Sequence, residues 1–218
     1  MKRKILLIGG GGHCRSVLDS VTALGCYDEI GILDANGQPC QGVSVVGTDE
    51  DIPLLMKDGW TEAFVTVGSI GDTSVRRKLF QMVKEYHLTI PAIVDPSAIT
   101  ARNVEIKEGA FIGKRAVINA GASLGFGSII NTGAVVEHDC RIGDFVHISP
   151  GTVLCGQVTV GHDSHVDDAI GNRVIFIGAD HGNDILIIPV KLKNPFVVGE
   201  QQVVTVGKKR MCCRFSRG

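Results

Sequence analysis

The sequence contains few aromatic residues, which make up 5% of its 218 residues and include one Trp and two Tyr. Glycine is frequent instead, at 28 positions. This combination is unusual for a compact core but suits a coil of short strands and tight corners. An excess of charge of either sign is also missing, because the formal net charge is -1. We therefore expect neither nucleic acid nor an anionic membrane as a partner.

Long apolar runs and paired cysteines are missing as well. No apolar run approaches the roughly 18 residues of a membrane span, and the apolar stretch 5–8 is too short for a signal peptide. The seven cysteines include no C-x-x-C pair, so we expect free thiols in a reducing compartment. Together these absences predict a cytoplasmic protein without a membrane span.

An aliphatic residue recurs at every sixth position through the second half of the chain. The eleven positions are Ile106, Ile112, Ile118, Leu124, Ile130, Val136, Ile142, Ile148, Leu154, Val160 and Val166. The residue two places earlier is small or at most the size of valine, and Gly or Asn often follows the aliphatic residue, as at Gly113 and Asn119. We expect this Gly or Asn to supply the positive φ of a corner.

This period favours a triangular coil over the ordinary strands of a β-sandwich. A period of two describes a strand, whereas a period of six adds a corner after each short strand, so that three strands close one coil. Stacked coils then pair as parallel strands. The sequence therefore predicts a left-handed parallel β-helix built from hexapeptide repeats, an exception to the usual right-handed crossover.

The register of the repeat fails after Val166. Its continuation would bury Asn172, Gly178 and Asp184, which do not fit the inside of the coil. One interpretation is a divergent cap over the open end of the coil. Another is a reading-frame disturbance, because 198–205 resembles a damaged repeat. Both interpretations stay open.

The first half has the pattern of a small α/β domain. Four segments are predicted as strands: 4–8, 29–33, 63–67 and 89–94. Helical spacing follows the first strand, and a charged helix is predicted around Arg76 after the third. We therefore expect a Rossmann-like domain at residues 1–95, with a glycine-rich loop after its first strand. The β-helix domain is expected at 96–218, with an irregular segment from about residue 167.

The glycine loop 9–12 admits three interpretations. It is a tight turn without a ligand, a dinucleotide fingerprint, or a cradle of bare N–H groups for a phosphate or a sugar. The fingerprint G-x-G-x-x-G would need glycine where Cys14 stands, and a helix N-terminus favours an anion. We therefore expect the cradle, with Asp34 after the second strand placed to accept a hydrogen bond from a base or ribose.

Two histidines of the repeat region bear on catalysis. His138 lies at a corner, two residues after the inward Val136. Attack of an amine or hydroxyl on a thioester needs a base of near-neutral pKa, which a histidine supplies. Asp139 or Glu137 would fix its tautomer. The alternative is an ordinary solvated corner histidine. His147 precedes an inward aliphatic residue and is expected on an outer face.

The stretch 162–168, rich in histidine and aspartate, raises the question of a metal site. Its residues lack the spacing of a metal-binding motif, so we expect a solvated corner and no metal. Packing accounts for Cys140 and Cys155, and a cysteine nucleophile is disfavoured.

Several of these segments together resemble the NeuD/PglD family of sugar acetyltransferases. They are the glycine loop that ends in His13, Asp34, the junction Asp95–Ala98, and Asn131–Thr132–Gly133 leading to Glu137–His138–Asp139. The match runs from about Lys4 to Val166. The resemblance implies an N-terminal sugar-nucleotide domain, a C-terminal left-handed β-helix and a homotrimer. It also implies that acetyl-CoA binds along the helix between neighbouring subunits.

The resemblance implies site residues position by position. His138 matches the general base and Asp139 the acidic residue that enhances its basicity. The nucleotide-sugar pocket is implied at Gly11, Gly12, His13, Asp34 and Gly68, and acetyl-CoA contacts are implied at His147 and Gly156. The chain departs from the family at Asp167–Asp168, where Gly and small residues are typical, and in the later coils.

The predicted function is direct transfer of an acetyl group from acetyl-CoA, as co-substrate, to a nucleotide-linked sugar. An amine acceptor is narrowly favoured over a hydroxyl, which would instead suit an O-acetyltransferase for sialic acid or another sugar. A hypothesis of another class is a catalytically impaired trimeric scaffold that binds a nucleotide sugar. An NAD-dependent dehydrogenase is disfavoured by the switch to hexapeptides by residue 106. The acceptor and the pathway stay open.

Overall fold

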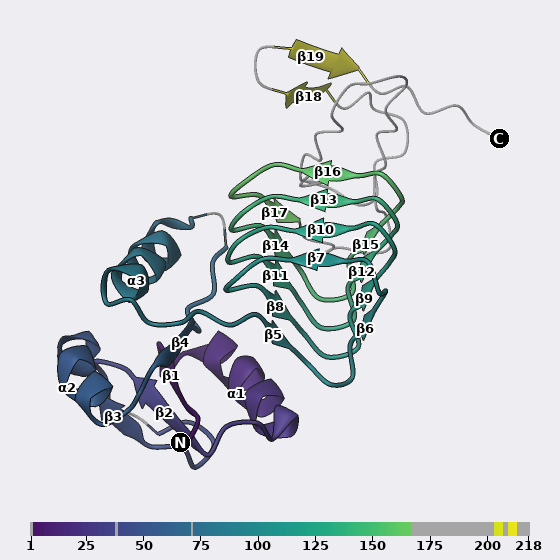
Figure 1. The fold of residues 1–218 in the computed structure, drawn as a ribbon. Helices are drawn as coiled ribbons and strands as arrows, with labels where there is room; N and C mark the ends of the chain where they lie inside the picture. Colours follow the sequence, from purple (N-terminus) through teal and green to yellow (C-terminus); the bar gives the residue numbers. More distant parts are fainter. Residues whose placement is uncertain (1, 38, 71, 167–202, 207–208, 213–218) are drawn as a thin grey trace.

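The computed structural model describes residues 2–37, 39–70 and 72–166, together with the backbone of 203–206 and 209–212. An N-terminal α/β domain comes first, and a coil of short strands rises from one side of it (Figure 1). The expectations for the segment after Val166 concern residues that lie outside the described ranges, namely Asp167–Asp168, Asn172, Gly178 and Asp184.

A four-stranded parallel sheet forms the centre of the N-terminal domain. Its strands are β1 (Lys4–Ile8), β2 (Glu29–Leu33), β3 (Val45–Gly47) and β4 (Glu62–Val65), in the spatial order β3-β2-β1-β4. Its helices are α1 (Gly12–Leu24), α2 (Ile52–Lys57), which continues a 3₁₀ turn at Asp49–Asp51, and α3 (Ser74–Glu85).

Helices cover both faces of this sheet, so β1 is apolar and buried from Ile5 to Ile8. Ile5 and Leu7 pack in one cluster with Val17 of α1, whereas Leu6 and Ile8 pack in another with Phe80 of α3. The glycine loop therefore leaves β1 at the carboxyl edge of the sheet, between two layers of helices. This is the edge at which open α/β sheets bind ligands.

The strands predicted at 4–8 and 29–33 are confirmed, and the one predicted at 63–67 lies at 62–65. The strand predicted at 89–94 is wrong as a single element. Thr89 forms an isolated bridge with Glu62, but Ile93–Val94 already belongs to the coil. Pro91 lies between these two pairings and has no N–H for a ladder. The short elements β3 and α2 were not expected.

Thirteen strands of two residues each form the coil. They are β5 (Ile93–Val94), β6 (Ile99–Thr100), β7 (Glu105–Ile106), β8 (Phe111–Ile112), β9 (Val117–Ile118), β10 (Ser123–Leu124), β11 (Ile129–Ile130), β12 (Val135–Val136), β13 (Arg141–Ile142), β14 (His147–Ile148), β15 (Val153–Leu154), β16 (Thr159–Val160) and β17 (His165–Val166).

These strands stack into three parallel sheets: β5-β8-β11-β14-β17, β6-β9-β12-β15 and β7-β10-β13-β16. Each strand pairs with the one that lies one coil further along, as when Ser123 pairs with Arg141 and Leu124 with Ile142. The structure confirms the predicted left-handed parallel β-helix.

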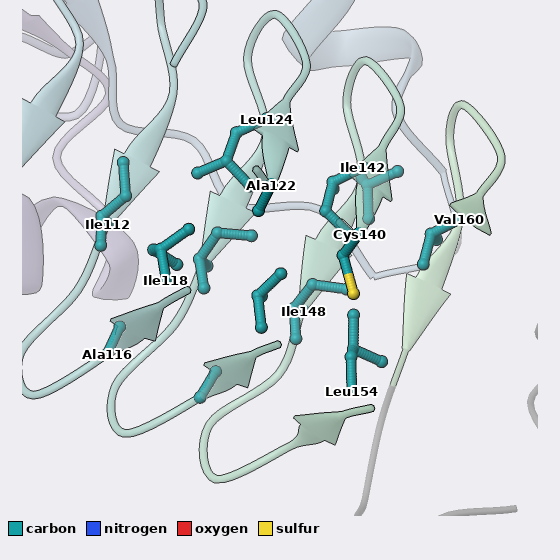
Figure 2. Close-up of a cluster of buried hydrophobic side chains, with 14 of the residues drawn as sticks. Ile112, Ala116, Ile118, Ala122, Leu124, Cys140, Ile142, Ile148, Leu154 and Val160 are labelled. Atoms are coloured by element: carbon teal, nitrogen blue, oxygen red, sulfur yellow. The ribbon is translucent and has the colours of Figure 1, made fainter. Parts of the chain in front are cut away.

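The predicted aliphatic column fills the inside of this coil. From Ile112 to Val166 the inward aliphatic side chains are at most 7% exposed. The small residues two places earlier, such as Ala122 and Cys140, pack beside them (Figure 2). Each buried aliphatic side chain contributes about 1.5–3 kcal/mol of transfer free energy. Because every coil supplies three of them, this column holds the prism together.

Positive φ does recur with the period of the repeat, but not where we expected it. It falls three residues after each inward aliphatic residue from Ile106 to Val160, with φ between 56° and 74°, at Gly109, Arg115, Gly121, Gly127, Gly133, Asp139, Phe145, Gly151, Gln157 and Asp163. The glycine that directly follows the aliphatic residue instead permits close stacking of coils. A Cβ on Gly125 would lie 2.4 Å from the carbonyl carbon of Gly143.

The N-terminal domain packs against one sheet and one corner of the coil. Phe111 and Ile129, on outward positions of the β5–β17 sheet, share a cluster with Cys14 of α1. Phe80 of α3 packs edge-on against Phe126 and Phe145 at the corner that precedes this sheet. The other two sheets, seen at the front and right of the coil in Figure 1, face away from the domain.

Two further strands follow at the C-terminal end. β18 (Val203–Val206) and β19 (Lys209–Cys212) form an antiparallel hairpin. Residues 203–205 of the segment suspected to be a damaged repeat therefore pair antiparallel, which is not the pairing of the coil. Across the described chain, no helix is both long and apolar enough to cross a membrane.

Candidate functional site

His138 lies in the turn between β12 and β13, at the corner that joins the two sheets facing away from the N-terminal domain. Its Nδ1 is 2.9 Å from Oδ2 of Asp139, and both side chains are more than half exposed. Because a carboxylate only accepts, Nδ1 carries the proton and the neutral ring keeps a lone pair at Nε2. Asp139 is the residue of positive φ in this turn, and this backbone conformation places its carboxylate beside the ring.

Gly156, one coil further along, lies directly against this imidazole. A Cβ at Gly156 would be 2.4 Å from Nε2 of His138. Glu137 has other partners, since its Oε2 accepts from Nδ2 of Asn119 at 2.9 Å and from the backbone N–H of His138 at 3.3 Å. Of the two acidic neighbours considered from the sequence, Asp139 is the one that holds the ring.

The glycine loop is fixed by Asp34 at the end of β2. Oδ2 of Asp34 accepts from the N–H of Gly10 at 2.6 Å, and Oδ1 accepts from the N–H of Asn36 at 2.8 Å. These bonds, that from Gly10 foremost, hold the pKa of Asp34 below its usual value. Gly9 has φ of 103°, and a Cβ there would lie 2.6 Å from a methyl group of Val67.

Gly11 and Gly12 leave the N-terminus of α1 open. No atom lies within 4 Å of a Cβ built on either glycine. The helix has no side-chain cap, and no acidic residue stands in its first turn. The first N–H groups of α1 therefore have no capping side chain, and uncapped N–H groups at a helix N-terminus can bind a phosphate.

His13 and Gly68 lie where the two loops of this edge meet the coil. The imidazole of His13 packs edge-on against Phe111, at 5.2 Å between centroids. Burial, with a smaller effect from the nearby Arg76 cation, lowers the pKa of His13 to about 3. The ring is therefore neutral and turned inward. Gly68 follows β4 and approaches the Cβ of His13, with a built Cβ at 3.4 Å.

His147 lies on the outward face of β14, as expected, but this face is covered by the N-terminal domain. Its Nδ1 is 2.9 Å from the carbonyl oxygen of Ser69, and its Nε2 is 3.1 Å from Nδ2 of Asn131. The ring stacks on His165, with 4.8 Å between centroids. Within one chain, therefore, His147 is close to the loop of Gly68 and on a different side of the coil from Gly156.

Arg76 is a residue that the sequence reasoning missed. Its side chain is 1% exposed, and it donates to the carbonyl of Val67 at 2.5 Å and to that of Gly127 at 2.7 Å. Burial lowers its pKa to about 10, so it stays charged at neutral pH. The signal was available: positions 76, 80 and 83 form the buried face of α3.

In the stretch 162–168, which is rich in histidine and aspartate, the side chains of the described residues bind other protein groups. Asp163 pairs with Arg77 at 2.6 Å, and Nδ1 of His162 accepts from the N–H of Asp144 at 2.8 Å. Among the residues that the structure describes, no group of three His, Cys, Asp or Glu side chains could hold a metal ion. Burial raises the pKa of the Cys140 thiol, which donates to the carbonyl of Cys155.

Known proteins match this chain in sequence over its first domain and over a longer region. Residues 4–83 match the PglD N-terminal domain family. GDP-perosamine N-acetyltransferase of Escherichia coli O157:H7 is 24% identical over 149 residues, which cover 66% of this chain. The matched region spans 65% of the length of that relative, slightly under two thirds.

Solved structures extend the likeness across both domains. Perosamine N-acetyltransferase from Caulobacter crescentus, a variant in complex with CoA and GDP-perosamine, is 36% identical with a TM-score of 0.70, and the match covers 75% of this chain and 76% of that one. The acetyltransferase domain of PglB from Neisseria gonorrhoeae, in complex with acetyl coenzyme A, is 32% identical with a TM-score of 0.69, covering 76% of this chain and 88% of that domain. The chain belongs to the NeuD/PglD family of sugar acetyltransferases.

Proposed function

We propose that this chain transfers the acetyl group of acetyl-CoA to the amine of a nucleotide-linked sugar, with His138 as general base. The observation that carries the proposal is the geometry of this histidine. Asp139 holds Nδ1–H at 2.9 Å, which leaves Nε2 as the proton acceptor. Two of the relatives named above are N-acetyltransferases, one of them bound to CoA and GDP-perosamine, which favours an amine over a hydroxyl.

His138 would serve both halves of the transfer. Its Nε2 accepts the proton that the amine releases as the nitrogen attacks the thioester carbonyl carbon. The new C–N bond forms, the C–S bond breaks, and Nε2 returns the proton to the departing sulfur. Asp139 stabilises the imidazolium that exists between these two events. These reaction steps require neither a metal ion nor an acyl-enzyme intermediate.

The nucleotide part of the acceptor is assigned to the edge of the N-terminal sheet. The open N–H groups at Gly11 and Gly12 suit the pyrophosphate, because both the donors and the helix dipole favour an anion there. Asp34 already accepts from Gly10 and Asn36. Its carboxylate has further lone pairs and can also accept from a ribose hydroxyl or a base. Gly68 lines the same edge from the loop after β4.

The proposal includes a homotrimer, because one chain does not bring the two halves of the site together. Its glycine loop lies on the side of the β5–β17 sheet, whereas His138 lies at the corner between the other two sheets. A sugar held by one copy would therefore meet the base of another. Acetyl-CoA is assigned to the groove between copies that passes Gly156.

An apolar stripe beside His138 supports contact between copies. The outward residues of the β6–β15 sheet are aliphatic in four successive coils and pair in register. They are Ile99, Val117, Val135 and Val153, of which Ile99 is 65% exposed and Val153 38%. An aliphatic stripe on the outside of a soluble coil is typical of an interface. Val135 is three residues from His138, so this interface would adjoin the base.

Replacement of His138 by alanine tests the proposal. We expect the turnover number to fall about 10²–10⁴-fold, because the base is lost, while binding of the nucleotide sugar stays unchanged. The assay follows release of the CoA thiol with a panel of UDP- and GDP-linked amino sugars. His162→Ala is the matched control, since this exposed histidine lies at another corner of the coil. Wild-type turnover in His138→Ala, or silence of the wild type across the panel, would contradict the proposal.

A further inference from the structure

A chain of hydrogen bonds leads from a turn of the coil to the loop after β4. The N–H of Thr132 donates to Oδ1 of Asn131 at 2.8 Å, so Nδ2 of Asn131 must be the atom that faces His147. That amide nitrogen donates to Nε2 of His147 at 3.1 Å. Nδ1 of His147 then carries the ring proton and donates to the carbonyl of Ser69 at 2.9 Å.

The direction of each bond in this chain is fixed by its two ends. A backbone N–H only donates and a carbonyl oxygen only accepts, so the imidazole between them has one allowed neutral tautomer. An imidazolium would turn an N–H of Nε2 toward the amide hydrogens of Asn131. His165 of the next coil stacks on this ring, with an angle of 8° between the two imidazole planes.

The carbonyl of Val67, on the other side of Gly68, is also held by a hydrogen bond from a side chain. Arg76 donates to Val67 at 2.5 Å and, with its second nitrogen, to Gly127 in the coil at 2.7 Å. The carbonyls of Val67 and Ser69 are thus both tied to the coil, and Gly68 lies between them. The coil therefore sets the conformation of a loop that lines the proposed nucleotide-sugar pocket.

We infer that His147 is a positioning residue for the acceptor: through its Nδ1–H it holds the carbonyl of Ser69 and so fixes the Gly68 loop against the glycine loop. This role rests on the proposed function for its catalytic consequence. It differs from the contact with acetyl-CoA that the family resemblance implies, because it predicts an effect on the nucleotide sugar rather than on acetyl-CoA.

Replacement of His147 by asparagine or by glutamine tests the roles of its two ring nitrogens separately. In His147→Asn the side-chain amide lies near the place of Nδ1 and can still donate to Ser69. In His147→Gln it lies near the place of Nε2 and can bond only to Asn131. We expect the KM for the nucleotide sugar to rise about three- to tenfold in the Gln variant and by less than about twofold in the Asn variant. The KM for acetyl-CoA should change little in either variant.

Three outcomes would overturn the inference. They are an equal rise of the nucleotide-sugar KM in both variants, no rise in either, and a rise confined to the KM for acetyl-CoA. The last outcome would favour the contact with acetyl-CoA instead.

Two measurements without substrate keep this inference separate from the proposed function. Nitrogen-15 NMR of the histidine-labelled wild-type protein should show the His147 ring protonated at Nδ1 only, with the signal assigned by its loss in His147→Asn. Hydrogen exchange of the amides at 66–70 should accelerate in His147→Gln and not in His147→Asn. If the tautomer is reversed, or if exchange is the same in both variants, the inference fails even where acetyl transfer is found. If both results hold and no acetyl transfer is found, only the proposed function fails.

Discussion

His138 owes its orientation to two neighbours, one in its own turn and one in the turn of the next coil. Asp139 binds Nδ1 from the positive-φ position, and the bare α-carbon of Gly156 leaves room for the ring near Nε2. Each neighbour performs a task that its residue type allows: aspartate tolerates the left-handed region, and glycine has no side chain. Nε2, the proton acceptor of the proposed mechanism, is thus placed by the spacing of the coil, which repeats every 18 residues.

Gly156→Ala tests this placement. The added methyl group would occupy the space of Nε2, at 2.4 Å, so the exposed ring must rotate away. We expect the turnover number to fall at least about tenfold, because a displaced base loses its contact with the amine. The melting temperature should stay close to that of the wild type, since the atom that moves is the end of a flexible side chain. Activity assays and thermal unfolding check the two parts.

The control for this substitution is Gly161→Ala. The nearest atom to a Cβ built there is Oγ of Ser164, at 3.9 Å, so this alanine fits without displacement. Equal losses of activity in both variants would show that any extra methyl on these turns disturbs the protein. The specific role of Gly156 would then be refuted.

At the scale of elements, the junction between α1 and the coil is organised around the buried Asp95. Its carboxylate accepts from the hydroxyls of Ser20 and Ser97, each at 2.6 Å, and lies 3.4 Å from Nζ of Lys114. Burial raises the pKa of Asp95, but these hydrogen bonds and the cation together outweigh it and lower the pKa to about 2. Lys114 also pairs with Asp19 of α1. The charged form of Asp95 therefore stabilises the junction.

This depressed pKa predicts a dependence of stability on pH. The folded-state pKa lies below the ordinary value, so the stabilisation is fully present above about pH 4 and is lost as the pH falls toward 2. Between about pH 5 and pH 2 we expect the wild type to lose roughly 2 kcal/mol more of its free energy of unfolding than Asp95→Asn does. Urea unfolding of both proteins at fixed concentration measures the difference. Parallel losses in the two proteins would contradict the assigned role of Asp95.

How far the sequence predicts these elements depends on how strictly their residues repeat. The inward aliphatic column has one physical solution, because only a coil of fixed period buries all of it. The place of positive φ was mispredicted since glycine serves two purposes in this repeat. At Gly125 it permits two coils to touch, whereas the left-handed position is filled at Asp139 and Phe145 by other residue types. Composition alone does not separate these roles.

In the site, the predictable part is what lies close along the chain. The pairing of His138 with Asp139 could be inferred from their adjacency, and its contact with Gly156 from the period of the repeat. The bond between His147 and Ser69 joins residues far apart in different domains, and no local pattern marks it. From the sequence Arg76 is only a member of a charged helix. Its burial could not be predicted, because only the fold brings to it the two carbonyls that accept its hydrogen bonds.

For the whole molecule, the arrangement of domains separates the two halves of the proposed site. The N-terminal domain covers the β5–β17 sheet, while His138 and the aliphatic stripe of the β6–β15 sheet lie on the sides that it leaves open. A single copy therefore presents a base without its acceptor and an acceptor loop without its base. Association through the stripe would complete both, and the closed symmetry of a trimer would give every copy the same site.

Complementation between two inactive variants tests this claim most directly. His138→Ala removes the base and keeps the loop. Gly12→Asp keeps the base and places a carboxylate before the pyrophosphate, in open space where it fits the fold. We expect each variant alone to be inactive. Co-expressed in equal amounts, they should regain about a quarter of wild-type activity, because in random trimers one site in four pairs an intact base with an intact neighbouring loop. No recovery in purified mixed trimers would contradict a site shared between copies.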